Sequence, residues 1–354
     1  MVGNLGFSSF GLGENFARDG VVEWFHLADD RARDYPLSGN ERNLVDGVTI
    51  AVCTYKRARS LNRFLDSLML QTRKPDRLII VDGSPDDETE RAVRNRQEVE
   101  KLAHCLTYFR LSASLRGLTR QRNFALQWVA TDKLAFFDDD VALSPECLIE
   151  MQNTLCAEDR VIGVGAVIQN QLGKPNIIWR LRRLLRVVPN LRPGSYCRSG
   201  MSIPWAFLAS CEDLTEGEWL SGCGAMWRTQ AVREVRFNEG FGGYAQGEDL
   251  DFSLRVRPYG KLVLASRARL DHLQEESGRP DHYKLGYMAI YNRYQIHRRC
   301  LSDRDWKDVL CFTYAWTIDS LLLMRHFLYP ARVIPTLKQL AGRFKGAYDA
   351  IMDH

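Results

Sequence analysis

Short apolar runs alternate with helix-forming stretches between residues 48 and 141, and this alternation constrains the fold more than any other feature of the sequence. The runs are Val48–Cys53, Leu78–Val81, Leu106–Phe109 and Leu134–Phe137. They are short and rich in β-branched or aromatic residues, as buried strands are. Because strands that alternate with helices are joined by right-handed crossovers, we expect an α/β fold with a mostly parallel central sheet flanked by helices.

Polar residues follow three of these runs directly. The segments 53–55, 82–84 and 138–140 all come where a strand is expected to end. In open parallel sheets, ligands bind beside the carboxyl ends of the strands. We therefore expect these three loops to meet at one edge of the sheet and to form a ligand site.

Three consecutive aspartates, Asp138, Asp139 and Asp140, follow the fourth run. Carboxylates two positions apart after a strand reach past its end together, and carboxylate oxygens are preferred ligands of Mg2+ and Mn2+. A metal there would neutralise the charge of a diphosphate leaving group. An acidic turn that only aids solubility is the alternative.

A second acidic cluster, Gly247 to Asp251, opens a predicted helix. Acidic residues at this place are favoured by the helix dipole, and capping explains Asp251. Asp249 is in addition a candidate general base, a role that requires it within hydrogen-bond reach of an attacking hydroxyl.

Five motifs occur in the order and with the spacing of one known family. They are VTIAVCTYKR at 48–57, IVDGS at 80–84, GLTRQRN at 117–123, FFDDDV at 136–141 and GEDLDFSLR at 247–255. Over residues 47–275 the chain resembles a family 2 glycosyltransferase with the Rossmann-like GT-A fold. The resemblance implies inverting transfer of a sugar, in a single displacement, from a nucleoside diphosphate sugar to an acceptor hydroxyl, with Mg2+ or Mn2+. It also implies a saccharide or glycolipid acceptor from a cell-surface polysaccharide pathway.

The resemblance assigns roles to individual residues. The donor nucleotide is expected at Thr54, Tyr55, Arg57, Asp82, Arg122, Asp138, Asp139 and Arg279. The metal ligands are expected to be Asp138, Asp140 and His272, although Asp139 leaves the register of the aspartate pair open. Asp249, with Glu248 before it, matches the Glu-Asp motif that carries the base. The alternatives are packing for Tyr55, a core or solvent position for His272 and a surface ion pair for Arg279.

Four parts of the chain are expected. Residues 1–46 form an N-terminal extension, 47–160 the nucleotide-sugar-binding half, 161–285 the acceptor-binding half, and 286–354 a helical C-terminal segment. In the acceptor-binding half, Trp219, Gly222 and Gly224 are candidates for shaping the sugar and acceptor site. Glycine in a strand often only permits close packing, which is the alternative for the two glycines.

Residues 160–211 contain eight cationic residues and no Asp or Glu. Within them, 177–198 interleaves arginines with apolar residues, a pattern that favours a peripheral contact with an anionic membrane or a phosphorylated or pyrophosphoryl-lipid acceptor. A solvated face that pairs with acids elsewhere is the alternative. The apolar stretch 306–329 favours helices that pack on the catalytic domain, or a homodimer interface.

Composition narrows the cellular setting. Nine cysteines without a CxxC pair favour a reducing cytosol. No secretory signal is apparent, and Val309–Met324 is interrupted by Asp319 and is too short to span a bilayer. The formal charge of +4 indicates no particular partner, and no nucleic acid is expected. We expect a cytoplasmic protein at the inner face of the membrane.

Two other functions stay open. A sugar nucleotidyltransferase would carry a Gly-rich loop with arginine after the first strand, whereas residues 54–57 contain no glycine. A catalytically inactive GT-A-fold binding protein would have lost acidic residues of the motifs, whereas all are present.

Overall fold

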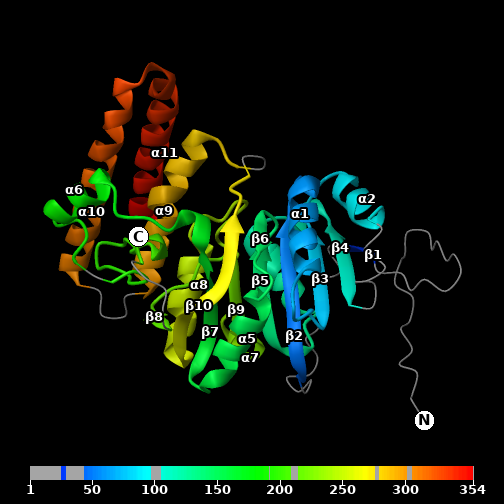
Figure 1. Ribbon diagram of the computed structural model, residues 1–354. Coiled ribbons are helices and arrows are strands. Elements are labelled where there is room, and N and C mark those ends of the chain that lie inside the picture. Colours follow the sequence, from blue (N-terminus) through cyan, green and yellow to red (C-terminus); the bar gives the residue numbers. More distant parts are fainter. Residues whose placement is uncertain are drawn as a thin grey trace, which may run out of the picture.

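The computed structural model describes residues 25–28, 44–96, 105–190, 192–208, 214–275, 279–300 and 305–353. One ten-stranded sheet runs through it (Figure 1). Its strands are β1 Phe25–Ala28, β2 Val45–Thr54, β3 Arg77–Asp82, β4 Leu106–Leu111, β5 Thr131–Asp138, β6 Val141–Leu143, β7 Val161–Ile168, β8 Thr215–Gly217, β9 Gly224–Arg228 and β10 Lys261–His272. Their order in the sheet is β1-β4-β3-β2-β5-β9-β7-β10-β6, and β8 pairs with β10.

The sheet is mostly parallel where the sequence predicted it to be. β2 pairs in parallel with both β3 and β5, and β4 pairs in parallel with β3. Each of the four predicted apolar runs lies within one of these strands. β9 runs antiparallel between β5 and β7 and so joins the two halves of the sheet. The predicted α/β fold is confirmed.

Helices flank the sheet and also form a group beyond it at the C-terminal end of the chain (Figure 1). They are α1 Ala58–Met69, α2 Glu88–Arg94, α4 Leu118–Leu126, α5 Cys147–Ala157, α6 Ile177–Leu184, α7 Thr229–Val235, α8 Glu248–Val256, α9 His282–Cys300, α10 Trp306–Leu323 and α11 Val333–Met352. Two 3-10 turns, η6 Met324–Leu328 and η7 Pro330–Arg332, connect α10 to α11.

The core lies on the two faces of the sheet, because successive side chains of a strand point to opposite sides. Ile50 and Phe137 belong to the buried cluster that α1 and α5 cover. Their neighbours Ala51 and Phe136 belong to the cluster that α4, α7 and α8 cover. Both faces are therefore apolar, which leaves the ends of the strands as the place for polar chemistry.

The predicted division of the chain into four parts stays a prediction. The strands before and after residue 160 belong to the same sheet. In the predicted extension 1–46, the strand β1 pairs in parallel with β4, which the sequence did not indicate. The remainder of 1–43 lies outside the described residues.

The C-terminal helices α9 and α11 are in backbone contact. A Cβ atom on Gly286 would overlap the carbonyl oxygen of Gln339, and one on Gly342 would overlap the carbonyl oxygen of Tyr283. A Cβ on Gly346 would lie 2.7 Å from the Tyr287 carbonyl oxygen. Glycine at these three positions thus lets α9 lie directly against α11. In the part of the chain that the structure describes, no helix has the length and apolar character needed to cross a membrane.

Candidate active site

A cavity of about 1000 Å³ opens at the carboxyl ends of β2 and β5. Its walls come from the loops after these strands, the start of α8, the end of β10, and α9. Most of the residues predicted for the site line it, namely Thr54, Tyr55, Arg57, Asp138, Asp139, Asp140, Gly222, Glu248, Asp249, His272 and Arg279. Two of the three strand-end loops that the sequence predicted to meet, 53–55 and 138–140, therefore line the cavity, whereas no residue of 82–84 does.

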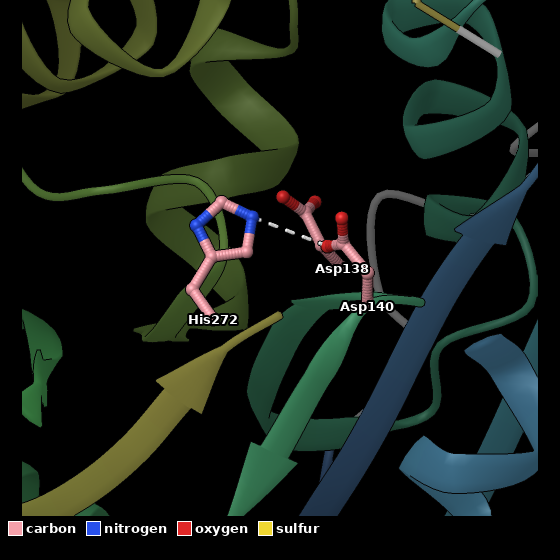
Figure 2. A group of neighbouring side chains, drawn as sticks. All are labelled: Asp138, Asp140 and His272. Atoms are coloured by element: carbon pink, nitrogen blue, oxygen red, sulfur yellow. Dashed lines mark ion pairs between the residues drawn. The ribbon is translucent and has the colours of Figure 1, made fainter. Parts of the chain in front are cut away.

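Asp138, Asp140 and His272 form a cluster in which one possible ligand atom from each residue lies within 4.8 Å of the others (Figure 2). Asp138 ends β5 and His272 ends β10. The short strand β6 begins one residue after Asp140, and its Val141 pairs with His272. This pairing places the imidazole Nε2 3.2 Å from Asp140 Oδ1. Two carboxylates and an imidazole are a donor set that suits a divalent ion such as Mn2+.

The contact between Asp140 and His272 favours the charged form of both groups, whereas burial raises the pKa of Asp138. Burial raises the pKa of the Asp140 carboxyl, but the bond to His272 and the nearby Arg57 outweigh it, so the pKa is lowered. Burial lowers the pKa of His272, and the bond to Asp140 outweighs it, so the pKa is raised. On the other side of the ring, the Gln171 amide lies 3.1 Å from His272 Nδ1. An outer partner of this kind fixes the ring orientation of a metal-binding histidine.

Asp139 points away from this cluster, toward the loop after β2. Its carboxylate accepts a hydrogen bond from Thr54 Oγ1 at 2.7 Å and one from Arg57 Nη1 at 3.1 Å. Burial raises the pKa of Asp139 to about 7, although Arg57 acts in the opposite direction. The structure thus groups Asp138 and Asp140, and not Asp139, with His272.

The buried guanidinium of Arg122 connects three parts of the site. It donates to Glu248 Oε1 at 2.6 Å, to Asp138 Oδ1 at 3.2 Å and to the Gly222 carbonyl oxygen at 3.0 Å. Burial opposes the charge of Arg122, but the carboxylates around it raise its pKa. Arg122 therefore stays charged and holds β5, α8 and the loop before β9 together.

Asp249 lies half-buried at the start of α8, on the cavity wall. Its Oδ2 accepts from the backbone N–H of Gly222 at 3.0 Å, and its Oδ1 accepts from that of Leu250 at 2.8 Å. A Cβ on Gly222 would come within 2.8 Å of Glu248 Oε1 and 3.1 Å of the Asp249 Cβ. Glycine at 222 thus permits the loop to approach α8 and to orient the Asp249 carboxylate.

Glu248 is buried beside Arg122, and its Oε2 has no hydrogen-bond partner among the described residues. Burial raises its pKa to about 8, against the influence of Arg122. Because its one bonded oxygen is held by Arg122, Glu248 is placed to position that side chain.

Two exposed residues line the mouth of the cavity. The Tyr55 side chain is exposed there. Arg279 donates to two backbone carbonyl oxygens, those of Glu275 at 3.1 Å and Gln274 at 3.0 Å. Among the described residues Arg279 therefore makes no ion pair, which was the alternative predicted for it, and it lines the cavity.

Four predicted site residues do not line the cavity: the buried Arg122 described above, and three others. Asp82 is fully buried at the end of β3, where it accepts from Ser84 and, at 2.6 Å, from Tyr108 Oη. Trp219 packs against the core, and its carbonyl oxygen accepts from the indole of Trp205. Gly224 is buried in β9, and a Cβ on it would overlap Leu270. In this structure Gly224 permits close packing, the alternative given for it from sequence.

Sequence reasoning missed the wall that α9 contributes. Its cavity-lining residues are Lys284, Tyr287, Met288, Tyr291 and Asn292. They recur at i, i+3, i+4, i+7 and i+8, which is the spacing of one helix face, and this pattern is visible in the sequence. Gln121 was also missed; its amide donates to the carbonyl oxygens of Thr54 and Val81 and so joins the ends of β2 and β3.

The basic stretch 160–211 is partly neutralised within the chain. Arg182 Nε donates to Asp319 Oδ1 at 3.0 Å, and Arg198 Nε lies 2.7 Å from Asp308 Oδ1. For these two arginines, the alternative of pairing with acids elsewhere is confirmed.

A mostly parallel sheet whose strand ends present a cavity and an Asp-Asp-His cluster defines a class of ligand-binding α/β proteins. The model of one family, "Glycosyl transferase family 2", matches residues 49–236, more than half of the chain. The chain belongs to this family, as the motifs predicted.

Solved structures of glycosyltransferases share the fold. The mannosyltransferase PcManGT from Pyrobaculum calidifontis, in complex with GDP-Man and Mn2+, is 14% identical with a TM-score of 0.54, covering 90% of this chain and 92% of that chain. GalNAc-T7 with UDP, GalNAc and Mn2+ is 13% identical with a TM-score of 0.52, covering 82% of this chain and 59% of that chain. These similarities confirm the GT-A fold. No curated protein matches the sequence significantly.

Proposed function

We propose that the protein transfers a sugar from a nucleoside diphosphate sugar to an acceptor hydroxyl, with inversion at the anomeric carbon, and uses Mg2+ or Mn2+. The observation that carries this proposal is that the Asp-Asp-His cluster and Asp249 line the same cavity. Its volume of about 1000 Å³ lies at the upper end of the range for small-molecule sites, large enough for a nucleotide sugar together with part of an acceptor.

Asp138, Asp140 and His272 would hold the metal, which supplies positive charge to the departing diphosphate. Arg57 and Arg279, which both donate to the Glu275 carbonyl oxygen, would bind the donor together, with Tyr55 against the base. Thr54 and Asp139 hold Arg57 in position through the bonds described above. Arg122 and Glu248 would position Asp138 and the start of α8.

Asp249 would take the proton from the acceptor hydroxyl as its oxygen attacks the anomeric carbon. The two backbone N–H groups that it accepts from leave the carboxylate at the cavity wall and fix its direction. A carboxylate so placed acts as a general base when it lies within hydrogen-bond reach of the nucleophile. A direct attack by the acceptor inverts the configuration because only one displacement occurs.

The acceptor would enter between Gly222 and α9. Tyr287 and Tyr291 stack with ring centroids 5.1 Å apart, and both line the cavity. Aromatic side chains combine apolar contact area with a polar tip, which suits the mixed surface of a saccharide or glycolipid. Trp219 and Gly224 would act from behind this wall, through packing. We place the reaction in a cell-surface polysaccharide pathway, in the cytoplasm at the inner face of the membrane, where a glycolipid acceptor lies.

The test is donor cleavage in the presence of Mn2+. The protein is incubated with UDP-, GDP- and dTDP-linked hexoses, with and without simple alkyl glycosides, and nucleoside diphosphate release is measured. We expect slow release to water with one donor, faster release with a suitable glycoside, and none with EDTA. Pyrophosphate formation from a nucleoside triphosphate and a sugar phosphate would instead identify a nucleotidyltransferase. Binding of a donor without any cleavage would identify an inactive binding protein.

A further inference from the structure

Two segments far apart in the sequence lack acidic residues altogether. The first is 160–211, with its eight cationic residues. The second is 320–348, which contains no Asp or Glu and carries Arg325, Arg332, Lys338, Arg343 and Lys345. In a chain with nearly equal numbers of acidic and basic residues, two such segments concentrate positive charge.

The fold brings the two segments together. α6, from the first segment, lies beside α10, and α10 leads into η6 and η7 of the second (Figure 1). Arg182 of α6 and Arg343 of α11 both bind the buried carboxylate of Asp319, at 3.0 and 3.1 Å. Tyr314 Oη also donates to the Leu185 carbonyl oxygen at 2.7 Å. These bonds fix α6 against the C-terminal helices.

The exposed side chains at this junction include cations without a carboxylate partner and apolar groups. Its exposed arginines are Arg180, Arg183, Arg186, Arg325 and Arg332, and none of them pairs with a carboxylate among the described residues. Its exposed apolar side chains are Ile177, Leu184, Leu328 and Tyr329, with relative exposures of 64%, 76%, 81% and 59%. We call these nine residues the α6–η7 face.

Arg325 of this face lies near two other arginines. Burial lowers the pKa of Arg325, the charge of Arg182 lowers it further, and that of Arg332 acts in the same direction, although Asp319 opposes them. Cations held near each other without a carboxylate partner are stabilised by an external anion. An anionic lipid surface meets both properties of the face, because it accepts arginines at its headgroups and leucine side chains below them.

We propose that the α6–η7 face binds the surface of an anionic membrane. The proposal deepens the membrane location included in the proposed function, and it moves the contact from the predicted 177–198 to 177–186 together with 324–332. Val187 and Val188 are buried and Arg198 pairs with Asp308, so these three residues of 177–198 are engaged within the protein.

The test is co-sedimentation of the full chain with vesicles. We expect binding to phosphatidylcholine vesicles that contain 30% phosphatidylglycerol, none to pure phosphatidylcholine, and a decrease with added salt. Each arginine near an anionic surface contributes a factor of about five to partitioning. The double variant Arg325→Ala, Arg332→Ala should therefore bind about 25-fold more weakly, and Leu328→Ser should also bind more weakly.

The matched control is Arg267→Ala, an exposed arginine of β10 outside this face, which should bind like the wild type. All variants should keep the wild-type melting temperature and the wild-type rate of donor hydrolysis. Failure of the membrane proposal can therefore be distinguished from failure of the proposed reaction. Wild-type protein that stays in the supernatant, or equal losses in Arg267→Ala and the double variant, would overturn the proposal. A change in oligomeric state in Leu328→Ser would overturn it too, and would assign the face to a second copy of the chain.

Discussion

Asp249 is the residue on which the chemistry of the proposed reaction depends. Replacing it with Asn keeps the size of the side chain and one acceptor oxygen, but it removes the base. A positioned general base contributes roughly 10²–10⁴-fold to a rate. We expect Asp249→Asn to lower kcat for transfer by about that factor and to leave the Kd for nucleoside diphosphate with Mn2+ unchanged, as measured by calorimetry.

Asp251 provides the control, because it lies on the same helix and carries the same group. Its carboxylate is fully buried and lies 2.7 Å from Arg255 Nη2. Asp251→Asn should lower the melting temperature while the folded protein keeps its kcat. Near-normal transfer in Asp249→Asn would show that another group takes the proton.

The metal site allows a test within the run of three aspartates. Asp140→Asn and His272→Ala each remove a member of the cluster, and loss of even an outer partner of a metal site costs about 10–100-fold in affinity. We expect both variants to bind Mn2+ at least about tenfold more weakly in calorimetric titrations. Asp139→Asn should lose less, since Asp139 faces Thr54 and Arg57. Equal losses in all three variants would contradict the grouping of the ligands.

Glu248 makes the stability of the fold depend on pH. Its pKa is about 8 in the folded protein, raised by burial, against an ordinary value of 4.5. Between these values the unfolded chain has released a proton that the folded chain keeps, so its contribution to stability is lost as pH rises. Glu248→Gln has no such proton. Relative to the wild type, its free energy of unfolding in urea should increase from pH 5 to pH 8.

The control for the pH effect is Glu146→Gln, which replaces an exposed carboxylate. Its difference from the wild type should stay constant over the same pH range. A constant difference for Glu248→Gln as well would mean that Arg122 keeps this carboxylate ionised.

For single residues, the sequence predicted which of them lie near the cavity better than it predicted which way their side chains point. Asp82 and Asp138 both end predicted strands, and the motifs treat them alike. Asp138 faces the cavity, whereas Asp82 is enclosed by Ser84 and Tyr108. Ser84 lies in the loop after β3 and Tyr108 lies in the neighbouring strand β4. These partners cannot be predicted from the position of Asp82 at the end of a strand. The role predicted for Asp82 in binding the base stays a prediction.

Among the elements, the contact between α9 and α11 sets the position of the acceptor wall. Alanine in place of Gly342 would improve helix propensity by about 1 kcal/mol. Its Cβ, however, would overlap the Tyr283 carbonyl oxygen, and backbone cannot move aside as a side chain can. Overpacking costs about 1–3 kcal/mol, so we expect Gly342→Ala to be destabilised in urea denaturation.

Gly242→Ala is the matched control, because a Cβ there meets nothing within 4 Å. It should unfold at the same urea concentration as the wild type. An unchanged midpoint for Gly342→Ala would mean that α9 and α11 separate easily, and that the acceptor wall is adjustable.

Elements with strong local patterns could be predicted, and elements that depend on distant pairing could not. The four apolar runs predicted as strands lie within β2, β3, β4 and β5, and the acidic cluster predicted to open a helix lies at the start of α8. β9 begins only at Gly224, and the loop before it is bonded to Arg122 and Asp249, which are distant in the sequence. β6 and β8 have three residues each and exist through pairing with β10, which no local pattern encodes.

At the scale of the whole molecule, donor binding should stabilise the fold. A ligand that binds only the folded state at 100 times its Kd adds about 2.7 kcal/mol to the free energy of unfolding. We expect one of UDP, GDP or dTDP, together with Mn2+, to raise the melting temperature, and EDTA to cancel the increase. The nucleotide with the largest shift identifies the base. A shift that persists in EDTA would show that the nucleotide binds without a metal.

The three-residue strand β6 affects the composition of the metal site. It follows β5 in the chain and pairs with β10 at the edge of the sheet. The register between β6 and β10 is therefore set at the place where the Asp-Asp-His cluster forms. Adjacent residues of a strand point in opposite directions, so a slip by one position would present Asp271 or Leu273 where the imidazole belongs. An all-oxygen or incomplete set would then replace the nitrogen-containing one. The cation that the protein prefers therefore indicates whether β10 pairs with β6 in the correct register.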